Sequence, residues 1–199
     1  MNRAAITALP AVAVLVLAGC AEPTAPDDGI TSDILASMHQ PPGPHVRPLR
    51  GDFTWVFDGW SLPAPGRCPG GGLWFLSTIH GTGMVSHMGR VAADGGHCID
   101  PFTFAFVNGE ITLQAANGDQ LFGTYEGVAF PGAAPNEVGW IDVLTVTGGT
   151  GRFDGAEGSA EETGVAIIAF DPATGLVTGG TGWSRIEGTI RYDASSRQH

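Results

Sequence analysis

The chain has 199 residues, 31 of them glycine, and a formal net charge of -11. This length suits one folded domain with extensions. The glycine, threonine and aromatic content, with few Lys, Glu, Leu or Ala runs at helical spacing, excludes an all-helical protein. The excess of acidic residues over arginines, with no lysine, argues against nucleic acid and anionic lipid headgroups as partners.

Residues 1–20 are organised like an export signal. Arg3 precedes an apolar run that is too short to remain in a bilayer, and the run ends in Leu17-Ala18-Gly19-Cys20. The pattern resembles the signal peptide of bacterial lipoproteins, which implies removal of residues 1–19 and acylation of the Cys20 thiol. It implies a lipid-anchored protein of the cell envelope, in the outer membrane of a Gram-negative host, because Ala21 is not the aspartate that favours inner-membrane retention. An ordinary secretory signal with a chance cysteine is the alternative.

Residues 20–50 are rich in proline, which removes backbone donors and blocks helices. We therefore predict a lipidated, disordered tether here, in which Ser32 to Met38 could form one helical turn. The folded domain is expected at residues 51–193 and a flexible tail at 194–199.

Strand-like runs separated by turn residues fill the predicted domain. Aromatic and β-branched residues between Gly and Pro clusters indicate about eight strands. The runs are Phe53–Phe57, Leu73–His80, Met84–Ala92, Phe102–Phe106, Glu110–Ala115, Gln120–Val128, Val138–Thr147, Glu157–Phe170 and Thr178–Tyr192. Asn108-Gly109 and Asn117-Gly118 are typical of two-residue hairpin turns and would make this part of the sheet a meander.

The strand count allows a sandwich or a barrel, and a closed barrel removes the exposed edges that make sheets aggregate. Glycines inside the predicted strands, such as Gly127 and Gly164, suit the bends of a barrel wall. We predict an all-β fold, a single antiparallel barrel of about eight strands, whose interior is either filled or holds one small ligand.

A turn motif lies between two of the predicted strands. Gly148-Gly149-Thr150-Gly151-Arg152-Phe153, with Ala156 and Gly158 following, resembles the Gly-Gly-Thr-Gly-x-Phe-x-x-Ala-x-Gly turn of the allene oxide cyclase and dirigent protein superfamily. Members of that superfamily are eight-stranded barrels, so the resemblance implies the same fold. Glycines in the motif admit positive φ, and Phe153 can fold back as a plug at the barrel end. No local motif matches the superfamily's catalytic positions, so the resemblance carries over no activity.

Cys68 and Cys98 form an even pair in an exported chain, which favours a structural disulfide. Closing a loop of this length would contribute roughly 3 to 4 kcal/mol. The alternative is a metal site that adds His97 and either His80 or His87 to the thiols. Zinc ligands usually come in pairs two to four residues apart, and Cys68 has no such neighbour, so we predict the disulfide, no metal and no cofactor.

His87 is the candidate catalytic base, because it lies within the apolar run Met84–Val91. Facing Glu126, Asp142 or Glu161 across an apolar lumen, it would form an acid–base pair. The alternative is a hydrogen-bonded residue of the barrel wall. The five tryptophans are interpreted as core and barrel-end packing, namely Trp55, Trp60, Trp74, Trp140 and Trp183.

Three functions fit this sequence. We expect a non-catalytic envelope protein, anchored in the membrane through the lipid on Cys20, that binds a small apolar molecule or a surface partner. The first alternative is an isomerase or cyclase that acts on an apolar substrate inside the barrel. The second is a structural or adhesive surface protein with a filled barrel and an outer apolar patch. Large apolar side chains touching across the lumen would favour binding, and a cavity with convergent histidine and carboxylate groups would favour catalysis.

Overall fold

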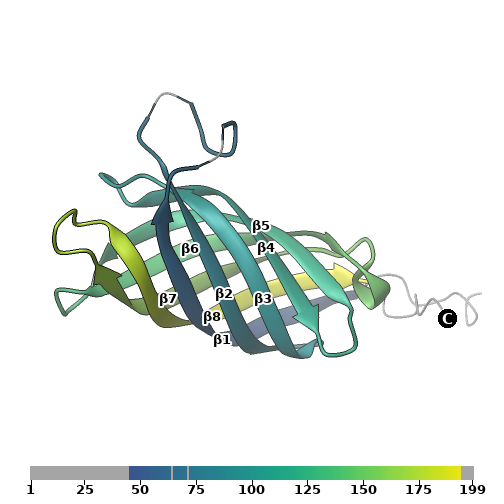
Figure 1. Ribbon diagram of the computed structural model, residues 1–199. Helices are drawn as coiled ribbons and strands as arrows, with labels where there is room; N and C mark the ends of the chain where they lie inside the picture. The colour runs from purple at the N-terminus through teal and green to yellow at the C-terminus, as the bar shows by residue number, and fades with distance from the viewer. Residues whose placement is uncertain (1–44, 64, 71, 194–199) are drawn as a thin grey trace, which may run out of the picture. The chain divides into compact units, whose positions relative to one another are not determined.

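The computed structural model describes residues 45–63, 65–70 and 72–193, which form a closed barrel of eight antiparallel strands (Figure 1). Each strand pairs with the next in sequence, and the last pairs with the first. The predicted all-β antiparallel barrel is confirmed. Its strands are β1 (His45–Ser61), β2 (Phe75–Val85), β3 (Gly89–Ile99), β4 (Ala105–Ala115), β5 (Gln120–Pro131), β6 (Glu137–Gly149), β7 (Glu157–Phe170) and β8 (Val177–Tyr192).

The expectations for the signal peptide, for Cys20, for the tether up to residue 44 and for the tail at 194–199 fall outside the described residues. Among the residues that are described, no helix is long and apolar enough to cross a membrane.

β1 begins at His45, ahead of the predicted domain boundary at residue 51. It pairs with β8 from His45 opposite Tyr192 onward, whereas its pairing with β2 starts only at Gly51 opposite Val85. Pro48 therefore lies where β1 has a neighbour on one side only, a position that tolerates a missing backbone donor. The proline content that suggested a tether did not reveal this strand.

Met84–Ala92 is not one strand, contrary to the prediction. β2 ends at Val85 and β3 begins at Gly89, and the residues between them form a tight turn. Backbone hydrogen bonds from Met88 to Val85 and from Ser86 to Arg50 fix this turn, and His87 within it adopts a φ of 67°. The apolar side chains around His87 belong to two strand ends that meet in a turn.

Asn108-Gly109 is not a hairpin turn either, because β4 runs through it. The register of β4 against β5 shifts between Phe106 and Gly109, and Asn108 adopts a φ of 53°, which together describe a β-bulge. The bulge lets both Phe106 and Gly109 face inward although three positions separate them. Phe102–Phe104 precedes the strand, so only Ala105 and Phe106 of the predicted strand at 102–106 belong to β4. Asn117-Gly118 is the turn between β4 and β5, as predicted.

The glycine-rich motif closes one end of the barrel. Residues Gly151–Phe153 form a 3-10 turn, η1, between β6 and β7, and the Phe153 side chain is fully buried. Its ring packs on Tyr192 at 5.0 Å between centroids, and the guanidinium of Arg152 lies 5.0 Å from the Phe153 centroid. The predicted plug is confirmed.

Candidate functional site in the barrel lumen

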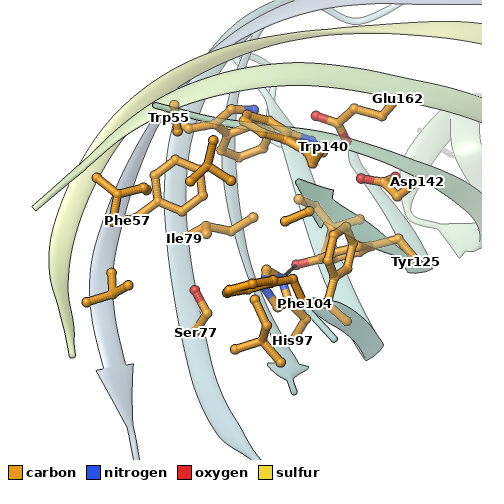
Figure 2. A pocket seen from close by; sticks show the side chains of 18 of the residues that line it. Trp55, Phe57, Ser77, Ile79, His97, Phe104, Tyr125, Trp140, Asp142 and Glu162 are labelled. Carbon is orange, nitrogen blue, oxygen red and sulfur yellow. Dashed lines mark hydrogen bonds between the residues drawn. The ribbon is translucent and has the colours of Figure 1, made fainter. Parts of the chain in front are cut away.

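A cavity of about 140 Å³ lies in the lumen, toward the end where β1 finishes (Figure 2). An engineered cavity of about 150 Å³ in another protein holds benzene, so the space suits a molecule with about one ring. Its walls are predominantly apolar, and their aromatic residues are Phe53, Trp55, Phe57, Trp60, Phe104, Phe106, Tyr125, Trp140 and Phe170. Ser77, His97, Asp142 and Glu162 are the other polar or ionisable side chains among the described lining residues.

The aromatic rings brace one another. Trp55 stacks on Phe53 at 5.0 Å, and Phe57 meets Trp140 edge to face at 5.9 Å. Trp140 lies over Gly164, its partner across β6 and β7, and a Cβ on that glycine would overlap the indole. An inward-facing glycine therefore leaves room for a large side chain to pack against the barrel wall. This role adds to the one predicted from the sequence, in which glycines allow the strands to bend. Rings held in this way cannot collapse to fill the space between them.

Asp142 and Glu162 face each other across β6 and β7, where they occupy directly paired positions. Both carboxyl groups point into the cavity on the same side, near Trp140 and Tyr125 (Figure 2). Asp142 is 4% exposed, and its Oδ1 atom has no hydrogen-bond partner among the described residues.

Burial raises the pKa values of this carboxyl pair. The pKa of Asp142 rises to about 8, because of burial first and then the charge of Glu162. Burial also raises the pKa of Glu162 to about 7, although hydrogen bonding to Ser184 and Trp55 partly offsets the shift. Near neutral pH the pair therefore holds about one proton between its two carboxyl groups.

His97 and Tyr125 form a second polar group in the lumen. A hydrogen bond of 2.9 Å joins His97 Nδ1 to the Tyr125 hydroxyl. Burial, followed by the positive charge of Arg67, lowers the pKa of His97 to about 4. Burial, followed by the charges of Asp142 and Glu162, raises the pKa of Tyr125. Both side chains are therefore neutral at physiological pH.

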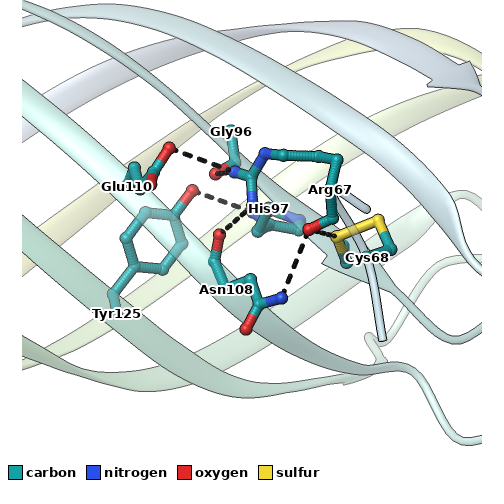
Figure 3. A network of polar contacts seen from close by, with 8 residues as sticks. Arg67, Cys68, Gly96, His97, Asn108, Glu110 and Tyr125 are labelled. Atoms are coloured by element: carbon teal, nitrogen blue, oxygen red, sulfur yellow. Dashed lines mark hydrogen bonds and ion pairs between the residues drawn. A yellow bond between two sulfur atoms is a disulfide. The ribbon is translucent and has the colours of Figure 1, made fainter. Parts of the chain in front are cut away.

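A clasp on the outside of the barrel holds the β4 bulge (Figure 3). Arg67 donates hydrogen bonds to the carbonyls of Asn108 at 2.7 Å and Gly96 at 3.1 Å, and the Asn108 side chain donates back to the Arg67 carbonyl. The disulfide Cys68–Cys98 ties the same loop to β3 and confirms the predicted pairing. Because its two thiols are joined, the alternative metal site cannot form.

His87 is not a lumen residue, so the predicted position of the base is wrong. Its side chain is exposed in the β2–β3 turn, and Nε2 donates to the Pro48 carbonyl at 3.0 Å. Glu126 and Glu161 are also exposed, because strand alternation turns them outward beside inward-facing Tyr125 and Glu162. The structure does not bring these three residues together, and only Asp142 of the four candidates reaches the lumen.

Sequence reasoning missed Glu162 and Tyr125, and it considered His97 only as a metal ligand. Strict alternation from the small residue Ala160 would have turned Glu162 inward, since one face of β7 carries Ala160, Glu162 and Gly164.

Trp55, Trp60 and Trp140 line the cavity, whereas Trp183 is 60% exposed on the outer wall and is not core packing.

His80, the other proposed metal ligand, lies on the outer wall between Asp58 and Asp94, at 2.9 and 2.6 Å. The part of the chain that the structure describes contains no group of three or more His, Cys, Asp or Glu residues that could hold a metal ion.

The chain matches no family model and no curated protein. It is similar to a solved structure, the pterocarpan synthase dirigent protein GePTS1, with 14% sequence identity and a TM-score of 0.46. The match covers 80% of this chain and 92% of that one. The closed eight-stranded barrel fits the architecture that the Gly148–Gly158 turn implied.

Proposed function

We propose that this protein is a lipid-anchored envelope protein whose barrel binds a small, largely apolar molecule in its lumen. The observation that carries the proposal is a cavity with braced aromatic walls and a few convergent polar groups, the usual composition of a ligand site. The anchor rests on the lipobox-like sequence ending at Cys20.

The cavity weighs against a purely structural or adhesive protein, because that alternative expects a filled barrel. Apolar side chains do occur on the outer wall, including Phe130 and Trp183. A structural or adhesive role would depend on this outer wall and would not explain the cavity inside the barrel.

A proton-transfer enzyme, such as an isomerase or cyclase, is the second candidate. It is favoured by the Asp142–Glu162 pair, which holds a proton at neutral pH inside an apolar cavity. However, the histidine in the lumen bonds to Tyr125 and not to a carboxylate. The predicted histidine–carboxylate pair is therefore not formed among the described residues, and binding is the better supported function.

Neighbouring residues of β5 offer a matched test of lumen binding. Ala129 lines the cavity, whereas Val128 is 40% exposed on the outer wall. We expect Ala129→Phe to fill the cavity and abolish the binding of toluene and indole measured by calorimetry, and Val128→Phe to retain it. If toluene and indole fail to bind the parent protein, or bind both variants equally, the proposed function is wrong.

A further inference from the structure

The Asp142 carboxyl group has an unsatisfied hydrogen-bond acceptor that faces the lumen. It is almost fully buried, lines the cavity, and leaves Oδ1 without a hydrogen-bond partner among the described residues. An unpaired buried carboxylate is costly unless a donor or a positive charge meets it. A bound molecule that fills the cavity could supply that donor.

The described groups packed around Asp142 supply no cation. Glu162 faces it from β7, Tyr125 faces it from β5, and Ser184 on β8 accepts a 2.8 Å hydrogen bond from the indole of Trp55. The described lining residues include no arginine, and the chain has no lysine. The ionisable groups of this lumen therefore carry net negative charge when the pair ionises.

Aromatic faces surround the same carboxyl groups. Trp140 and Trp55 line the cavity on the side of the pair, and Phe57 packs edge to face on Trp140 (Figure 2). Indole and phenol rings attract organic cations through their electron-rich faces, most strongly where water is excluded. The rings would also strip the hydration shell from a metal ion without replacing it, so an organic cation suits the site better.

Given the proposed lumen binding, we propose that the ligand is an organic ammonium ion with an apolar body of about one ring. Its ammonium group lies between Asp142 and Glu162 and donates to Asp142 Oδ1, and its apolar body lies against the tryptophan rings. An ammonium group offers three donors, enough for both carboxylates. The cavity volume sets the size of the ligand, and the net charge of the chain favours the approach of a cation.

The charge of the ligand predicts how its affinity depends on pH. An ammonium ion binds the ionised pair, so its affinity rises as the pH rises through the range in which Asp142 and Glu162 lose their proton. A neutral ligand of equal shape does not gain in this way. His97 stays neutral throughout that range, because burial holds its pKa at about 4.

The test compares 2-phenylethylamine with its neutral analogue 2-phenylethanol, using the full chain in detergent and calorimetry from pH 6 to pH 8.5. We expect the amine to bind at least about tenfold more tightly than the alcohol at pH 8.5. We also expect its affinity to rise by at least about tenfold from pH 6 to pH 8.5, because the carboxyl pair loses at least one proton over that range. Asp142→Asn should remove most of the amine's advantage. Glu161→Gln, which removes an exposed acid next to Glu162 on the outer wall, should keep it.

Equal, pH-independent affinities for the amine and the alcohol would overturn the ammonium proposal and leave lumen binding intact. Failure of both compounds, together with toluene and indole, would overturn the proposed function as well. The pH dependence of the parent protein requires no substitution, so the test stands even if Asp142→Asn does not fold.

Discussion

The two halves of this barrel differ in how completely side chains fill them. The closed half, where β1 begins, is packed with aliphatic residues and the η1 plug, namely Leu49, Val91, Leu121, Ile190 and Phe153. The cavity half, where β1 ends, contains the braced rings and the carboxyl pair. Of the buried polar residues of the described chain, Ser77, His97 and Asp142 line the cavity, and Ser184 accepts a hydrogen bond from Trp55, which also lines it.

This difference has a simple physical origin. Branched aliphatic side chains interdigitate to crystal-like density, whereas flat rings fixed on glycines and on one another leave a gap between them. The closed half therefore contributes more to the stability of the fold. The cavity half contains an unfilled space and two buried carboxyl groups, both of which lower stability. A protein that needed only a stable barrel would not bury two facing carboxyl groups in it.

The largest expected effect is in the closed half. Phe153→Ala should lower the free energy of unfolding by about 3–5 kcal/mol, because the ring is fully buried and its removal leaves a cavity under the plug. Chemical denaturation measures this loss. Phe170→Ala, in the cavity half and 46% exposed, is the matched control and should cost far less. Equal losses would remove the stability difference between the halves.

Loss of the disulfide should come next. Replacing Cys68 and Cys98 by alanine should cost about 3 kcal/mol and release the loop that carries Arg67. We expect amide hydrogen exchange to accelerate most at the β4 bulge around Asn108, since Arg67 no longer holds its carbonyl. Faster exchange at η1 than at the bulge would show that the clasp does not act on the cavity half.

The carboxyl pair makes stability depend on pH. Because burial raises the pKa of Asp142 above its unfolded value of 3.8, to about 8, the folded state binds the proton more tightly. The stabilisation is complete below pH 4 and is lost as the pH rises toward 8. Asp142→Asn should therefore be more stable than the parent by several kcal/mol at pH 8, with little difference at pH 4. A stability difference that is independent of pH would contradict the raised pKa.

The smallest effect on the barrel is expected from Cys20→Ser. This change should move the protein from the membrane fraction to the soluble fraction, because acylation of Cys20 would anchor it. The unfolding free energy of both halves should stay within about 0.5 kcal/mol, since the change lies outside the barrel strands. A soluble parent protein with an unmodified Cys20 would contradict the lipoprotein interpretation.

Local patterns predicted the features that depend on neighbouring residues. Asn117-Gly118 formed its turn, and Phe153 folded back as a plug, because short-range backbone preferences decide both. Cys68 and Cys98 paired because the pair had no competing thiol in the predicted domain. Each of these outcomes needs few assumptions about distant strands.

The candidate site depended on strand register, which no local pattern reports. Asn108-Gly109 has the sequence of a hairpin turn, yet its position opposite β3 and β5, held by Arg67, makes it a bulge. His87 has apolar neighbours on both sides, yet a turn separates them. A shift of one residue exchanges the inner and outer faces of a strand. An error of one residue in the predicted register therefore changes which acidic side chains are expected in the lumen.

The sequence by itself determined the all-β class, the number of strands to within about one, the plug and the disulfide, because composition, turn residues and cysteine count act locally. Only the tertiary structure decided that Asp142 faces Glu162, that His97 reaches Tyr125, and that a cavity remains between the rings. These contacts join strands whose pairing and curvature are set by closure of the whole barrel.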